Sequence, residues 1–72
     1  MTIEEKLILI AETLDAEQNN VKPETELKSL EEWDSMGVIS TIAMLDRKFA
    51  KVLSAEQIEE LKTVQDILNL MA

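Results

Sequence analysis

Apolar residues recur at helical spacing in three separate stretches of this 72-residue chain. The three sets are Ile3, Leu7, Ile10 and Leu14; Val38, Ile42, Leu45 and Phe49; and Val64, Ile67, Leu68 and Met71. Each set falls on one face of an α-helix, whereas no stretch alternates between apolar and polar residues as a half-buried strand does. The pattern therefore predicts an all-α fold.

Capping signals mark where the helices start. Three pairs have the spacing of a capping box, in which two side chains satisfy the first free N–H groups of a helix: Thr2 with Glu5, Ser54 with Gln57, and Thr63 with Asp66. Asp34 is suited to cap a helix that runs from about Ser35 to Lys48 or Ala50. We expect residues 1–72 to form a single domain, a four-helix bundle with three main helices, one short helix containing Ile58 and Leu61, and a long first loop.

The segment from Ala16 to Trp33 keeps no helical period, and Pro23 lies near its middle. Its apolar residues are spaced like anchors that pin a loop onto a bundle: Val21, Leu27, Leu30 and Trp33. A loop of this length in a compact domain usually has a function or contains short turns. We expect Trp33 to cover the core rather than to contact a ligand.

A second apolar stripe lies on the helix that begins near Ser35. It consists of Met36, Ile39 and Ala43 and runs beside the stripe that contains Val38. The two stripes together predict a wide apolar face, and hence a central helix packed against several others. Gly37, in the first turn, is either tolerated there or leaves room beside the serine.

The chain has no histidine and no cysteine. Serine and cysteine triads therefore cannot be built, and a zinc site lacks its preferred nitrogen and sulfur ligands. Adjacent carboxylates such as Glu59 and Glu60 are more typical of a solvated helix face, and a chain of this size has little room for a substrate cleft. We expect a protein that is not an enzyme and holds no metal.

The charge is strongly negative and unevenly spread. Fifteen acidic residues against seven basic ones give a formal charge of −8, and residues 1–36 carry −7 of it. Nucleic acid is an unfavourable partner, because phosphate binding needs clustered lysine and arginine, whereas a protein with a basic surface is the natural complement. Self-repulsion favours a monomer. The acidic start and the lack of a long apolar run predict no secretory signal, no membrane span and a cytoplasmic location.

Ser35 is the residue that most suggests chemistry. It follows the capping Asp34 at the start of a helix, where free N–H groups and the helix dipole favour an attached phosphate. A serine that another enzyme modifies needs no base of its own, which fits a chain without histidine. The simpler interpretation is that Asp34 and Ser35 only cap the helix.

The surrounding sequence favours modification. The run Leu30-Glu31-Glu32-Trp33-Asp34-Ser35-Met36 resembles the attachment motif of acyl carrier proteins, in which Asp-Ser-Leu or Asp-Ser-Met opens the second helix. The segment 42–49 is similar to the family's apolar second helix, and 63–67 is similar to the start of its last helix. With the matching length, acidity and long first loop, the resemblance covers essentially the whole chain.

This resemblance implies a carrier role. Ser35 would receive 4'-phosphopantetheine from coenzyme A through a phosphopantetheinyl transferase, which Asp34 would assist. The thiol of the arm would hold an acyl group as a thioester and pass it between acyl-loading and acyl-accepting enzymes of a fatty-acid-like, lipid or specialised pathway. Partner contacts are expected from residues around and beyond the serine: Glu31, Glu32, Met36, Ile39 and Asp46.

The sequence departs from typical fatty-acid carriers in two places. Acids two and five residues after the serine are replaced by Gly37 and Ser40, and the helix ends with Arg47 and Lys48, followed by Lys51, where the family is usually acidic. We therefore expect a dedicated pathway rather than the general fatty-acid synthase. The Asp-Ser-Met-Gly run is also similar to D-alanyl carrier proteins, so the alternatives are a D-alanyl or other aminoacyl carrier and an unmodified helical adaptor.

Overall fold

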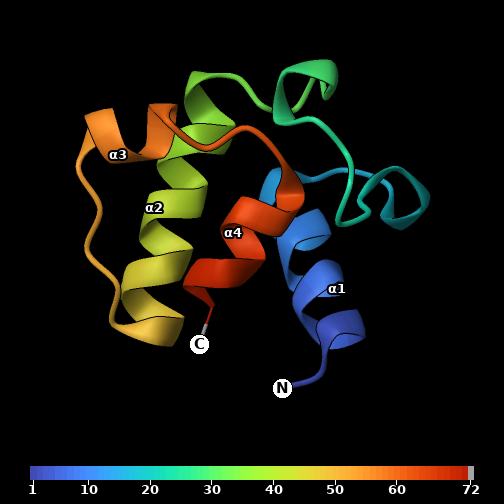
Figure 1. Cartoon of the computed structure of the whole chain (residues 1–72), viewed down its shortest axis with the longest axis horizontal. Coiled ribbons are helices and arrows are strands. Elements are labelled where there is room, and N and C mark those ends of the chain that lie inside the picture. Colours follow the sequence, from blue (N-terminus) through green and yellow to red (C-terminus); the bar gives the residue numbers. More distant parts are fainter. Residues whose placement is uncertain (72) are drawn as a thin grey trace.

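The computed structural model describes residues 1–71, and within this range the fold is entirely helical. The α-helices are α1 (Ile3–Leu14), α2 (Ser35–Phe49), α3 (Ala55–Glu59) and α4 (Val64–Leu70), and two short 3-10 turns, η1 (Gln18–Asn20) and η2 (Leu27–Ser29), lie in the first loop. Figure 1 shows α1 and α2 running in opposite directions, with the start of α2 at the loop end of the bundle. The predicted four-helix bundle with a short third helix and a long first loop is confirmed.

The helix starts follow the capping signals. The Thr2 N–H donates to Oε1 of Glu5 at 2.9 Å, and the Ser54 N–H donates to Oε1 of Gln57 at 2.9 Å. Oδ2 of Asp66 accepts from the N–H groups of Lys62 and Thr63 at 2.9 and 3.1 Å. These backbone hydrogen bonds hold the pKa values of the Glu5 and Asp66 carboxyls below their usual range, because they favour the charged forms.

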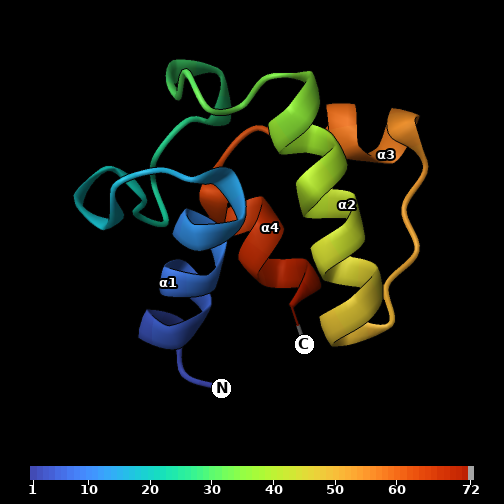
Figure 2. The ribbon, with the colours of Figure 1, turned by 180° about the vertical axis from the view of Figure 1, so that it is seen from behind.

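The core is formed mainly by α1, α2 and α4. Viewed along the shortest axis of the molecule, α4 lies between α1 and α2 (Figure 2), and α1 packs against both of them. The buried cluster is aliphatic, with Met44 and Met71 among its members. The placement of Met71 on the buried face of the last helix is confirmed.

The first loop is fixed to the bundle by side chains and by backbone hydrogen bonds. Val21, Leu27 and Leu30 are buried, and Trp33 packs against the core with part of its surface exposed. The Leu27 N–H donates to the Lys62 carbonyl at 2.8 Å, and the Val64 N–H donates to the Thr25 carbonyl at 2.9 Å. The loop is therefore tied to the α3–α4 connection, and the predicted anchors are confirmed.

The prediction of a wide buried apolar face on α2 is wrong. Met36 and Ile39 are 71% and 61% exposed, and Ala43 is exposed as well. The buried side of α2 instead contains the following four residues: Gly37, Thr41, Met44 and Leu45. The reason is that α3 has only five residues and cannot cover the remaining side of a fifteen-residue helix.

Smaller differences concern the helix ends. Ile3, placed in the first apolar stripe, is 61% exposed, because the start of α1 extends past the core. Leu61 lies beyond the end of α3 rather than within it. Helix α2 ends at Phe49, where Ala50 adopts a left-handed conformation with φ 54°. Among the described residues, no helix combines the length and the apolar character needed to cross a membrane.

The capping contact of Asp66 gives a pH-dependent prediction. Asp66→Ala should lower the free energy of unfolding at pH 7 by about 1 kcal/mol, because two backbone N–H groups lose their acceptor. The folded-state pKa of Asp66 is lowered, so this stabilisation is present above the unfolded-state pKa of about 3.9 and disappears as the pH falls through the folded-state value. Urea unfolding of both proteins between pH 7 and pH 3 measures the difference.

Glu59→Ala is the control, since Glu59 is an exposed carboxylate at a position that caps no helix start. Its effect should stay within about 0.5 kcal/mol. An Asp66→Ala deficit of the same size at pH 3 and pH 7 would contradict the assigned role of the carboxylate.

Candidate functional site

Ser35 is the first residue of α2 and is exposed. Asp34 precedes it as the N-cap, and Oδ1 of Asp34 accepts from the Gly37 N–H at 2.9 Å. The Val38 N–H donates to the Asp34 carbonyl at 2.9 Å and closes the first turn. The hydroxyl of Ser35 is therefore presented to solvent at a helix N-terminus whose geometry is fixed by the residue before it.

Gly37 explains how the serine is held in place. A Cβ atom at this position would overlap the carbonyl oxygen of Glu32 and would lie 3.1 Å from Cδ2 of Leu14. The loop before Ser35 and the end of α1 therefore press directly on the first turn of α2. Gly37 is required by this close approach, so the expectations that it is merely tolerated, or that it leaves room beside the serine, are replaced by a packing role.

Most of the predicted contact residues gather around Ser35. Glu31 and Asp34 are exposed, Glu32 is half-buried, and Met36 is among the most exposed large apolar side chains of the chain. Ile39 lies one helical turn after Ser35, on the same side of α2. These residues form an exposed surface that is acidic on the loop side and apolar on the helix side.

Asp46 does not belong to this group. It is exposed and shares the side of α2 that carries Ser35, but it lies eleven residues later. At the rise of an α-helix this places it about 16 Å along the axis from Ser35. Any contact that it makes with a partner is separate from the contacts beside the serine.

Sequence reasoning missed the contribution of α1 to this site. Because α1 and α2 are antiparallel, the end of α1 lies beside the start of α2. A shallow hollow there is lined by Thr13, Leu14 and Asp15 of α1, together with Glu32, Asp34, Met36, Gly37 and Ser40. No spacing in the sequence links Asp15 to Asp34, since only the tertiary packing brings them to the same hollow.

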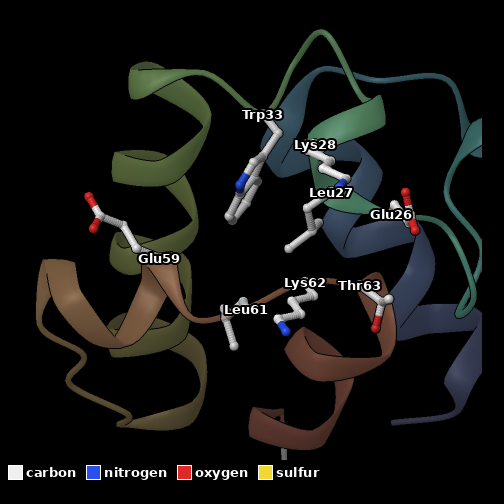
Figure 3. A pocket seen from close by; sticks show the side chains of 8 residues that line it. All are labelled: Glu26, Leu27, Lys28, Trp33, Glu59, Leu61, Lys62 and Thr63. Atoms are coloured by element: carbon white, nitrogen blue, oxygen red, sulfur yellow. The ribbon is translucent and has the colours of Figure 1, made fainter.

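A larger cleft lies beside the loop that leads to Ser35 (Figure 3). Its volume is about 540 Å³, and it is lined by Glu26, Leu27, Lys28, Trp33, Glu59, Leu61, Lys62 and Thr63. The indole of Trp33 projects into it. The expectation that Trp33 covers the core is confirmed, and the same side chain also forms a wall of this cleft.

The site fits a covalently attached phosphodiester. The Ser35 hydroxyl is exposed, and the first N–H groups of a helix together with the helix dipole favour a phosphate at this position. The arrangement presents a group for attachment and does not assemble a base, a nucleophile and an oxyanion site as hydrolytic catalysis requires.

The comparisons with known proteins agree with this geometry. The family model described as "Phosphopantetheine attachment site" matches residues 7–71. The chain is 31% identical over 67 residues to an acyl carrier protein of Helicobacter hepaticus, covering 93% of this chain and 88% of that protein. It is 36% identical over 60 residues to an acyl carrier protein of Phytoplasma mali, covering 83% of this chain and 71% of that protein. No solved structure gives a significant match.

The chain therefore belongs to the acyl carrier protein family. Proteins of this family are carriers rather than catalysts. The group they carry is a covalently attached 4'-phosphopantetheine, which supplies a terminal thiol for thioester formation. Through this thiol a chain with no cysteine of its own can hold a thioester.

The close approach at Gly37 gives a stability prediction. Gly37→Ala should lower the free energy of unfolding by about 1–2 kcal/mol. The added methyl displaces the Glu32 backbone, and the cost of this displacement exceeds the gain in helix propensity from glycine to alanine. Urea unfolding monitored by circular dichroism measures the change. Ser40→Ala, less than one turn further along α2, adds no atoms and should have little effect. A Gly37→Ala protein as stable as the wild type would contradict the packing role.

Proposed function

We propose that Ser35 is the attachment point of 4'-phosphopantetheine and that residues 1–72 act as a single carrier domain. The observation that carries this proposal is the exposure of Ser35 as the first residue of α2, directly after an aspartate that caps the helix. Ser35 also lies within the segment that the attachment-site family model matches. No other serine of the chain combines a place at the start of a long helix with this motif.

Asp34 serves two purposes in this proposal. Its Oδ1 accepts from the Gly37 N–H, which holds the carboxylate in one position beside the serine. A carboxylate fixed in this way assists the phosphopantetheinyl transferase, whose donor coenzyme A brings phosphate and whose reaction uses magnesium. Asp34 therefore both shapes the first turn of α2 and takes part in recognition of the attachment site.

The surface around Ser35 recognises partner enzymes. Glu31 and Glu32 contribute negative charge that steers a basic partner surface toward the serine, which mainly raises the association rate. The exposed apolar side chains of Met36 and Ile39 offer area that a partner can bury. Asp46 provides a more distant acidic contact on the same side of α2.

The carrier delivers an acyl intermediate between a loading enzyme and an accepting enzyme of a fatty-acid-like, lipid or specialised pathway. The names of the two curated relatives favour an acyl cargo over a D-alanyl cargo. Two departures from typical fatty-acid carriers support a dedicated pathway, namely Ser40 and the basic end of α2. The missing acid at Gly37 does not bear on this question, because packing against Glu32 excludes any side chain there.

Intact-protein mass spectrometry tests the attachment site. The purified chain is incubated with coenzyme A, magnesium and a broad-specificity phosphopantetheinyl transferase. The wild type should gain one phosphopantetheine, and Ser35→Ala should gain none while keeping its helical circular dichroism spectrum. Loss of the modification without loss of the fold separates attachment from capping, since the Asp34 cap is unchanged in this variant.

Ser40→Ala and Ser54→Ala are the matched controls and should both be modified like the wild type. A folded wild-type chain that gains no mass would favour the unmodified adaptor. A gain that persists in Ser35→Ala would place the attachment elsewhere. If the modified protein is then loaded by an aminoacyl-activating enzyme but by no acyltransferase, the cargo is an amino acid.

A further inference from the structure

A continuous groove follows the contact between α1 and α2, away from Ser35 itself. It consists of two adjoining hollows that share Thr13 of α1 and Ser40 of α2. The α2 side of the groove is formed by Met36, Ser40, Ala43 and Arg47, whose spacing of three to four residues places them on one face of the helix. The groove therefore extends along most of α2.

The two ends of this groove carry opposite charge. Asp15, Glu32 and Asp34 border the end at the start of α2, whereas Arg47 and Lys48 border the other end. Arg47 lies twelve residues after Ser35, about 18 Å along the helix axis. This separation exceeds twice the screening length of about 8 Å at physiological ionic strength, so a partner meets each end as a separate charge rather than meeting the net charge of the chain.

The surface between the two ends mixes apolar and polar side chains. Met36, at the acidic end, is 71% exposed, Ala43 is exposed toward the basic end, and Thr13 and Ser40 lie half-buried between them. A mixture of this kind is typical of the surfaces at which proteins meet transient partners. The opposite charges of the two ends define which partner fits it.

We propose that this groove docks an enzyme partner that places basic groups beside Asp15 and Asp34 and an acidic group opposite Arg47. Arg47 is then a specificity-determining residue, since a partner that is basic along its whole contact surface meets a like charge there. This inference rests on the proposed carrier function and adds the charge order of the partner. Asp46, the residue before Arg47, lies on the side of α2 that carries Ser35, about 100° around the helix from Arg47, so Arg47 is the charge that a partner in the groove meets directly.

Arg47 carries the proposal better than its neighbours do. Lys48 also borders a third hollow, which shares Leu9 and Lys48 with the second and contains Glu5 and Glu12 of α1, so acidic residues lie beside its charge. Lys51 is exposed beyond the end of α2 and lines neither hollow of the groove. Reversing Arg47 or Lys51 changes the net charge equally, which makes Lys51 a matched control.

The test uses a defined probe enzyme, an acyltransferase of a general fatty-acid synthase chosen for a carrier-binding surface that is basic throughout. Each carrier is first converted to the phosphopantetheine form and quantified by mass spectrometry, and kcat/KM for acyl loading is then measured. Arg47→Glu should raise kcat/KM by about three- to tenfold, mainly through a lower KM, because a repulsive contact becomes attractive. Lys51→Glu should change it by less than about twofold.

A charge swap on the probe enzyme completes the test. Replacing one basic residue of its carrier-binding surface with glutamate should raise kcat/KM for the wild-type carrier and lower it for Arg47→Glu, if that residue faces Arg47. Arg47→Gln, which removes the positive charge without reversing it, should give an intermediate kcat/KM. It controls for the loss of a favourable positive charge at the C-terminal end of α2. Melting temperatures of all variants show whether they are equally folded.

The outcomes separate the two proposals. Equal kcat/KM for Arg47→Glu and Lys51→Glu would overturn the groove proposal, because only overall charge would then matter. An unchanged kcat/KM for Arg47→Glu, at any ionic strength, would overturn it as well. Failure of the wild type to accept phosphopantetheine would instead overturn the attachment at Ser35, and it is detected before any loading assay.

Discussion

The site depends on the contact between the Glu32 carbonyl and the first turn of α2. At Gly37 the loop backbone and Leu14 of α1 come so close to the helix that no side chain fits between them. This contact joins three parts of the chain, namely the end of the long loop, the end of α1 and the start of α2. The contact also fixes the position of Ser35, because Ser35 lies in sequence between Glu32 and Gly37, the two residues that touch.

The long loop shows how a small aliphatic core can hold an exposed site in a defined place. The twenty consecutive residues from 15 to 34 lie outside the α-helices. They are held in place by a few buried side chains such as Leu27 and by backbone hydrogen bonds to the α3–α4 connection. Each such bond contributes only about 1 kcal/mol. Their combined effect is to bring Trp33 over the core and to direct the chain into Asp34 and Ser35.

Exposure, rather than burial, is the informative property of α2. A helix in a bundle normally buries its apolar residues, so the exposed Met36 and Ile39 require another explanation. Their place beside Ser35 is explained by the proposed carrier role, in which partner enzymes approach this residue. The charged residues of the same helix are unevenly placed, with acids around its start and the basic pair Arg47 and Lys48 at its end. The net charge of the chain does not describe this difference between the two ends of the helix.

Local pattern was sufficient for much of this structure. The sequence by itself determined the helices and the capping pairs such as Thr2 with Glu5, because these depend on spacing within a few residues of the chain. It also offered Ser35 as the candidate attachment residue, through the resemblance of its surroundings to the attachment motif of acyl carrier proteins. Only the tertiary structure decided which side of α2 is buried, that Gly37 is required, and that Asp15 lies beside the site. These depend on contacts between residues that are distant in sequence, namely Gly37 with Glu32 and Leu14, and on a third helix too short to cover α2.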